Sequence, residues 1–154
     1  MSNEHNLSNM GFGTKTVHGG HIKDTQFGSL ATPIFQTSTF IFDSAEQGGN
    51  RFAGKEDGYI YSRIANPTVA EIERKIALLE GGEAAIGTAS GMGAISSALW
   101  TALKAGDHVV ASDTLYGCTF ALLNHGLTKM GVEVTFVDPT NLEEVKNAMK
   151  ENTR

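Results

Sequence analysis

A glycine flanked by serine and methionine stands where a short apolar run gives way to a helical pattern, at Ser90-Gly91-Met92. Glycine lets the backbone approach an anion closely, and the first N–H groups of a helix have no partner within the helix. These groups lie at the positive end of the helix dipole, so the arrangement suits a phosphate. Because many folds share it, the tripeptide predicts a phosphate site and identifies no cofactor.

Two other segments carry side chains suited to a phosphorylated, planar ligand. The loop that starts at Asp113 contains Tyr116, whose ring could stack on a flat cofactor, and then Cys118. Upstream, Tyr61 and Arg63 stand two residues apart. In an extended segment such residues point to the same side, so they could hold a phosphate together.

The elements that must position these residues follow an α/β pattern after Asn66. Asn66 and Pro67 are typical of a helix start, and apolar residues recur at helical spacing until Gly81. Strand-like runs then alternate with helical stretches, the strands at 84–88, 108–111 and 132–137 and the helices at about 92–104, 118–129 and 141–150. This order predicts a mostly parallel sheet flanked by helices, with ligands outside the carboxyl ends of the strands.

Residues 1–63 lack helical periodicity and are expected to form an extended arm that packs on another surface. The exception is a short helix near Ser44, which has Gln47 at capping-box spacing but is weakened by Gly48 and Gly49. We therefore divide the chain into an arm, 1–63, and the first part of a larger domain, 64–154.

Composition argues against nucleic-acid-binding, membrane and secreted proteins. The 154 residues carry a net charge of −5 and no basic cluster, which argues against nucleic acid or an anionic membrane as partner. The first six residues have no signal-peptide pattern, and no apolar run approaches the roughly 20 residues of a membrane span. The single cysteine fits a reducing compartment, so we expect a cytoplasmic protein. No histidine pair has metal-ligand spacing on a helix, and His18 and His21 are expected in a glycine-rich loop, so no metal site is predicted.

Four motifs stand in order along the chain: Tyr61-x-Arg63-x-x-Asn66-Pro67-Thr68, Ala89-Ser90-Gly91-Met92-x-Ala94-Ile95, Gly106-Asp107-His108 and Tyr116-Gly117-Cys118-Thr119. Their order and spacing resemble the Cys/Met-metabolism family of pyridoxal 5'-phosphate (PLP) enzymes, from about Phe12 to the last residue. The resemblance implies an aspartate-aminotransferase-like PLP-binding domain, incomplete in this chain and preceded by the arm. It also implies a homotetramer, built as a dimer of dimers, with shared active sites.

The resemblance implies a role for each candidate residue. The N–H groups of Gly91 and Met92, with Ser90, would hold the cofactor phosphate. Tyr116 would stack on the pyridine ring and act as an acid toward the leaving thiolate. Cys118 would lie near the sulfur end of the substrate. The remaining pair, Tyr61 and Arg63, would reach the phosphate in the neighbouring subunit.

Within the family, Cys118 distinguishes between groups of members better than the rest of the four motifs does. Most members have glycine or another small residue at this position, whereas members that act on methionine have Tyr-Gly-Cys-Thr. The implied reaction is γ-elimination of L-methionine to methanethiol, 2-oxobutanoate and ammonia. Cystathionine γ-lyase and O-acetylhomoserine sulfhydrylase activities remain alternatives.

The chain departs from the family pattern at the cofactor lysine, which the family carries in a Ser-x-Thr-Lys setting. Lys129 follows Leu127-Thr128 within a predicted helix and lacks that serine. We therefore expect the lysine to lie beyond Arg154 and this chain to be an N-terminal fragment that is inactive alone.

Simpler interpretations remain open for each residue. Ser90-Gly91-Met92 could be an ordinary strand-to-helix turn, Tyr116 a loop aromatic that covers the core, Arg63 a surface charge and Cys118 a small buried side chain. Two other functions also remain. A dinucleotide-dependent oxidoreductase could use Gly91-x-Gly93, although Ser96 replaces the third glycine. A non-catalytic assembly fragment would need only a subunit interface.

Overall fold

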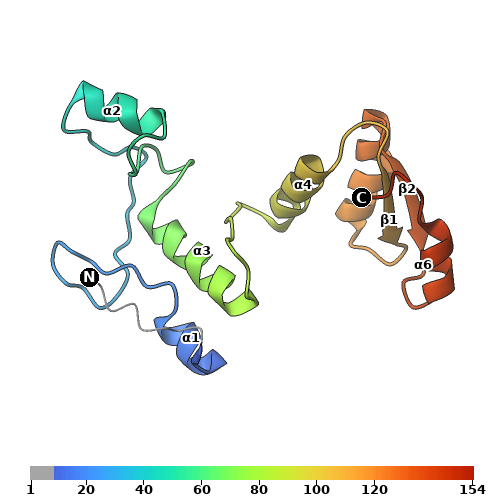
Figure 1. The fold of residues 1–154 in the computed structure, drawn as a ribbon, viewed down its shortest axis with the longest axis horizontal. Helices are drawn as coiled ribbons and strands as arrows, with labels where there is room; N and C mark the ends of the chain where they lie inside the picture. Colours follow the sequence, from blue (N-terminus) through green and yellow to red (C-terminus); the bar gives the residue numbers. More distant parts are fainter. Residues whose placement is uncertain (1–8) are drawn as a thin grey trace. The chain divides into compact units, whose positions relative to one another are not determined.

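The computed structural model describes residues 9–154, which form two compact units divided between Gly87 and Thr88 (Figure 1). The first six residues, where no signal peptide was expected, lie outside the described range. None of the helices in residues 9–154 is long and apolar enough to cross a bilayer.

Helix α3, Pro67–Glu80, is the longest helix of the first unit, and its ends are those predicted. The Asn66 side chain accepts a hydrogen bond from the N–H of Thr68 at 2.9 Å, and Pro67 occupies the first helical turn. Gly81 ends the helix in the left-handed conformation, with φ +67°, and its N–H donates to the Ala77 carbonyl. Both ends are therefore set by local residues.

Helix α2, Ala45–Phe52, confirms the short helix expected after Ser44. The Ser44 hydroxyl accepts the N–H of Gln47 at 3.1 Å, while the Gln47 side chain accepts the N–H of Asp43 at 2.7 Å. The second bond reaches one residue before the usual partner of a capping box, the N–H of the capping residue itself.

Helix α1, Phe12–His18, contradicts the prediction that this stretch lacks a helix. It has seven residues, no side-chain cap and no buried residue, so the sequence offered little signal. The helix instead packs on α3: a Cβ added at Gly20, where φ is +71°, would lie 2.5 Å from the N atom of Lys75. His18 is consequently the last residue of a helix and not part of a loop.

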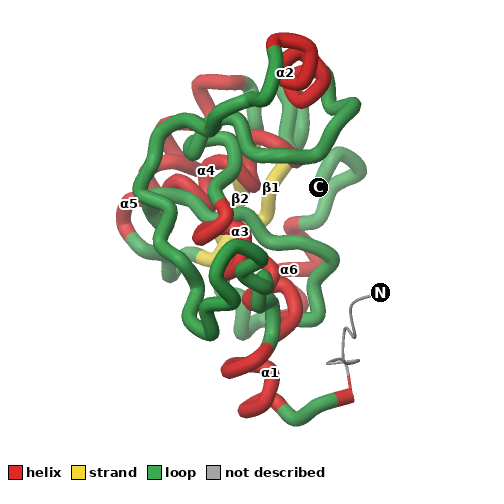
Figure 2. Tube along the Cα trace, turned by 90° about the vertical axis from the view of Figure 1, so that its left-hand side faces the viewer, coloured by secondary structure: helices red, strands yellow, loops and turns green. Residues whose placement is uncertain are grey.

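The second unit contains a parallel pair of strands, β1, His108–Ser112, and β2, Glu133–Val137, which lie side by side in Figure 2. His108 pairs with Glu133 and the register continues to Ser112 and Val137. The buried side chains Leu123, Leu127 and Val132 form the core of this unit. Helix α6, Leu142–Ala148, packs against β2 and is capped by Asn141, near its predicted bounds.

The strand predicted at 84–88 does not form in the described structure. A strand needs a neighbour that completes its ladder, and the N–H of Gly87 donates instead to the Glu73 carboxylate at 2.6 Å. Ile86 is 84% exposed, so this run is not buried as a central strand of a parallel sheet would be.

The helices around the sheet differ in regularity from those predicted. Helix α4 spans Gly91–Ala102, close to the expected range. The single helix expected at 118–129 is three consecutive segments: helix α5, Gly117–Ala121, a π-helical turn, Leu122–Gly126, and a 3-10 turn, Leu127–Met130. Gly131, with φ +81°, ends the last of them. The side-chain pattern predicted helical structure here but not the changes in hydrogen-bond spacing.

Candidate active site

The amino end of α4 presents backbone N–H groups at an open surface. Ser90 precedes the helix, and its hydroxyl oxygen accepts the N–H of Gly93 at 3.0 Å. The hydrogen bonds found within residues 9–154 leave the N–H groups of Gly91 and Met92 without an acceptor. A Cβ added at Gly91 would meet no atom within 4 Å, so the space on the Cβ side of this residue is open. Free N–H groups at the start of a helix suit an anion.

The loop after β1 is fixed at both of its ends. The N–H of Asp113 donates to the Val137 carbonyl at 2.9 Å, which ties the loop to the carboxyl end of β2. The Ser112 hydroxyl accepts the N–H of Thr114 at 3.1 Å. At the far end, the rings of Phe120 and Phe136 lie 4.7 Å apart and hold α5 on the sheet. The loop is therefore held in place while its middle remains exposed.

Tyr116 and Cys118 are presented by this loop at the start of α5. The Tyr116 side chain is exposed, as is Cys118. A hydrogen bond with the Cys118 side chain, and the negative charge that this thiol would carry when ionised, raise the pKa of Tyr116 above that of free tyrosine. The phenol of a tyrosine is protonated near neutral pH, and a shift in this direction leaves it so.

One contact joins the two candidate segments of the second unit. The Thr119 hydroxyl donates to the sulfur of Met92 at 3.6 Å, so the start of α5 lies against the start of α4. The structure thus brings Ser90, Gly91 and Met92 together with the loop that carries Tyr116. Thr119 is the last residue of the fourth motif, but the sequence does not predict its contact with Met92. Nothing in a sequence identifies the partner of a hydroxyl group in another element.

Tyr61 and Arg63 belong to the first unit, and the extended geometry expected for them is wrong. The N–H groups of Ile64 and Ala65 both donate to the Tyr61 carbonyl, at 2.8 and 3.0 Å, which closes a turn. The two side chains nevertheless come together, since the Arg63 guanidinium lies 5.3 Å from the centre of the Tyr61 ring.

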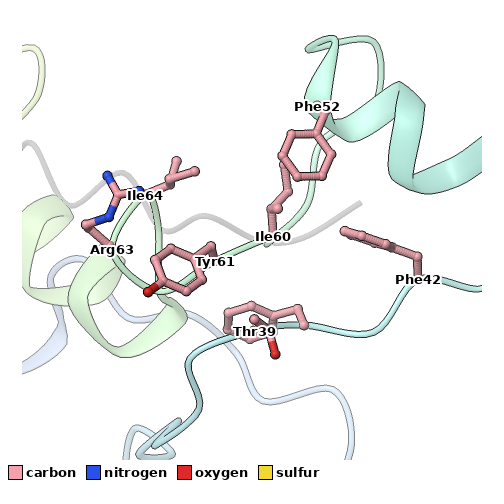
Figure 3. Close-up of a pocket in the computed structure, with 8 residues that line it drawn as sticks. Thr39, Phe42, Phe52, Ile60, Tyr61, Arg63 and Ile64 are labelled. Atoms are coloured by element: carbon pink, nitrogen blue, oxygen red, sulfur yellow. The ribbon is translucent and has the colours of Figure 1, made fainter. Parts of the chain in front are cut away.

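This pair borders a shallow, mostly apolar hollow of about 420 Å³, shown in Figure 3. The other residues that line it are Thr39, Phe40, Phe42, Phe52, Ile60 and Ile64. Phe52 and Ile64 are 69% and 63% exposed, so the hollow opens at the surface of this unit. A guanidinium and a phenol at the border of such a hollow can both donate hydrogen bonds to an anion.

The described residues contain no cluster of three or more His, Cys, Asp or Glu side chains that could hold a metal ion. His108 is fully buried, and its two ring nitrogens each bond a threonine hydroxyl at 2.8 Å, on Thr135 and Thr153. This histidine therefore serves the packing of the second unit.

Comparison with known proteins identifies close relatives along almost the whole chain. It is 68% identical over 148 residues to an L-methionine gamma-lyase of Fusobacterium nucleatum and 62% identical over 148 residues to one of Porphyromonas gingivalis; both matches cover 96% of this chain. The chain spans 37% of the length of each of these relatives.

A similar crystal structure is that of a Campylobacter jejuni protein assigned as an O-acetylhomoserine (thiol)-lyase, which contains a pyridoxyl-lysine monophosphate. It is 36% identical, with a TM-score of 0.85 over 95% of this chain and 36% of that protein. The model of the family described as Cys/Met metabolism PLP-dependent enzyme matches residues 13–154. Because this model covers almost the whole chain, the chain belongs to this family of PLP-dependent enzymes.

Proposed function

We propose that the whole protein catalyses PLP-dependent γ-elimination of L-methionine to methanethiol, 2-oxobutanoate and ammonia. The observation that carries this proposal is the exposed Tyr116 and Cys118 pair beside the free N–H groups of Gly91 and Met92. The identity to two L-methionine gamma-lyases supports the substrate. Family membership removes support for the dinucleotide-dependent alternative.

The residues of the second unit fit PLP. The N–H groups of Gly91 and Met92 would bind its phosphate, with the Ser90 hydroxyl donating a further hydrogen bond while its oxygen still accepts from Gly93. The exposed Tyr116 ring would stack on the pyridine. When bound, PLP withdraws electrons from the amino-acid substrate and stabilises negative charge on its carbon atoms.

Tyr116 would supply the proton that the leaving group needs. The phenol is protonated near neutral pH, and its proton would pass from the phenol oxygen to the sulfur as the thiolate departs. Cys118, which shares the loop, would lie near the sulfur end of the substrate and favour methionine over larger substrates. Neither residue holds the cofactor covalently, and Lys129 lies in a 3-10 turn without the family's lysine motif. We therefore expect the 154-residue chain to be inactive by itself.

Tyr61 and Arg63 would bind the phosphate of the cofactor in a neighbouring subunit of a homotetramer. In support, both side chains lie together at the border of the hollow, where both can donate hydrogen bonds to an anion. In the whole protein, mixed oligomers of an Arg63→Ala subunit and a subunit without its cofactor lysine should recover activity, because one kind of site is then intact. Failure to recover activity in oligomers that demonstrably form would contradict shared sites. We place the enzyme in the cytoplasm on the basis of its composition.

The activity is tested by supplying the purified whole protein, loaded with PLP, with methionine, cystathionine or O-acetylhomoserine plus sulfide. Methanethiol and 2-oxobutanoate released in equal amounts from methionine, with the highest kcat/KM of the three reactions, would support the proposal. A higher kcat/KM for cystathionine or O-acetylhomoserine would instead favour the cystathionine γ-lyase or O-acetylhomoserine sulfhydrylase alternative. If the PLP-loaded oligomer turns over none of these substrates, the non-catalytic assembly function is the remaining alternative.

A further inference from the structure

The turn that carries Tyr61 and Arg63 does not fix its own direction. Its internal hydrogen bonds run from the N–H groups of Ile64 and Ala65 to the Tyr61 carbonyl, and they shape only the backbone of the turn. The Tyr61 side chain is partly exposed and Ile64 is largely exposed, so burial holds the turn weakly. An antiparallel bridge between Thr39 and Tyr61 ties the turn to the preceding segment, but not to α3. Side-chain contacts must hold the turn relative to α3.

Asn66 supplies those contacts from a buried position, at 7% exposure. Its side-chain oxygen accepts the N–H of Thr68 at 2.9 Å and so caps α3. Its amide nitrogen donates to the Ser62 hydroxyl at 2.8 Å and to the Phe35 carbonyl at 3.0 Å. Both donors of the amide are used, and one side chain joins the helix, the turn and the segment around Phe35.

Ser62 is the residue between Tyr61 and Arg63. Its N–H donates to the Ser38 carbonyl at 2.8 Å, and its side chain makes two further hydrogen bonds. The Ser62 hydroxyl accepts from Asn66 and donates to the Thr37 carbonyl. A rotation of Ser62 would therefore displace both neighbouring side chains, which Figure 3 shows beside each other at the border of the hollow.

We propose that Asn66 is a positioning residue, which holds the Tyr61–Arg63 turn in the geometry that binds the cofactor phosphate. The inference rests on the proposed role of Tyr61 and Arg63 in phosphate binding. Asn66 does not itself touch the phosphate. It acts through Ser62, and its function in the turn is separate from its function as the cap of α3.

Asn66→Asp separates the two functions. Aspartate caps a helix as well as asparagine does, but it has no N–H to donate and would place an oxygen against the Phe35 carbonyl. The Ser62 hydroxyl could donate to the aspartate only by leaving Thr37. Thr68→Val is the matched control: the Thr68 hydroxyl bonds the segment at Pro33 and Phe35 but makes no contact with the turn.

The measurement is the dissociation constant of the apo form of the whole protein for PLP and for pyridoxal, which lacks the phosphate. Asn66→Asp should raise the constant for PLP about 10- to 100-fold, as expected when hydrogen bonds to a charged group are lost. It should change the constant for pyridoxal by less than about twofold, since that ligand makes no phosphate contact. Thr68→Val should leave the ratio of the two constants as in the parent protein.

Equal weakening of both ligands by Asn66→Asp would overturn the inference, because it would show a general loss of structure. Arg63→Ala separates this failure from failure of the proposed function. If Arg63→Ala leaves the ratio unchanged, the phosphate assignment is wrong and the inference is lost with it. If Arg63→Ala changes the ratio and Asn66→Asp does not, only the positioning role is wrong.

The double variant tests whether Asn66 acts through Arg63. Asn66→Asp should have little further effect on the ratio in an Arg63→Ala background, whereas additive effects would contradict the inference. Should Asn66→Asp fail to fold, Ser62→Ala removes the same link at the half-buried Ser62, and the same change in ratio is expected.

Discussion

Replacement of Glu71 by glutamine should loosen the segment around residues 21–32 from helix α3. Glu71 is 6% exposed, and both carboxylate oxygens are engaged. One accepts the N–H of Ile22 at 3.3 Å; the other accepts the Thr32 hydroxyl and lies 3.5 Å from the His21 ring nitrogen Nδ1. Glutamine keeps the size but turns one acceptor into a donor, so at least one of these partners loses its bond.

The magnitude follows from the charge of the acceptor. A hydrogen bond to a charged group contributes roughly 1.5–3 kcal/mol, and leaving a buried partner unsatisfied costs a similar amount. The loss of one such bond should increase the population of the state in which residues 21–32 are detached from α3, by about 10- to 150-fold. We therefore expect amide hydrogen exchange at Ile22 and its neighbours to accelerate by this factor in the whole protein.

The same contact should respond to pH with a defined sign. Burial raises the pKa of Glu71, but hydrogen bonds from Thr32 and from the N–H of Ile22, and then the His21 contact, outweigh it, so its pKa is lowered. A carboxyl with a lower pKa in the folded state stabilises that state above its unfolded pKa, and this stabilisation is lost as the pH falls through the folded pKa. The difference between parent and Glu71→Gln should therefore shrink as the pH falls from neutral through the carboxyl range.

Hydrogen exchange followed by mass spectrometry measures both effects. Glu80→Gln is the control, because Glu80 is an exposed glutamate at the last position of the same helix. An acceleration by Glu71→Gln of less than about twofold, or a difference that stays constant as the carboxyl titrates, would refute the role assigned to Glu71.

Three further outcomes are expected. In the whole enzyme, Tyr116→Phe keeps the ring and removes the proton, so kcat for methionine should fall about 10²- to 10⁴-fold with little change in PLP affinity; an unchanged kcat with chemistry rate-limiting would exclude the acid role. Cys118→Gly should lower the ratio of kcat/KM for methionine to that for cystathionine, and an unchanged ratio would make Cys118 a marker only. Gly81→Ala should cost about 1–2 kcal/mol in denaturant unfolding, because φ is +67° and no atom lies near the added Cβ; Gly82→Ala, without a positive φ, is the control.

Features whose determinants lie within a few residues were predictable from the sequence. The ends of α3 follow from Asn66, Pro67 and Gly81, and the start of α4 follows from Ser90. The two strands of the parallel pair were predicted from their apolar runs. In each case the deciding contact joins residues no more than a few positions apart, or the run is rich in the β-branched residues that favour strands.

Features decided by distant contacts were missed or predicted wrongly. Helix α1 depends on the surface of α3, and the run at 84–88 has no strand beside it among residues 9–154. The extended segment expected at Tyr61 and Arg63 is wrong, because a turn places these side chains side by side. No local pattern distinguishes these outcomes, because each depends on which partner is present.

The two parts of the candidate site are therefore built on different physical grounds. At the start of α4 the proposed ligand-binding groups are backbone N–H groups, which any well-capped helix presents once Ser90 has fixed its first turn. At the Tyr61–Arg63 turn the proposed groups are side chains, and on our proposal their placement depends on a buried amide at Asn66. Substitutions that leave α4 capped should preserve phosphate binding there, whereas the turn should be sensitive to changes in residues that never touch the ligand.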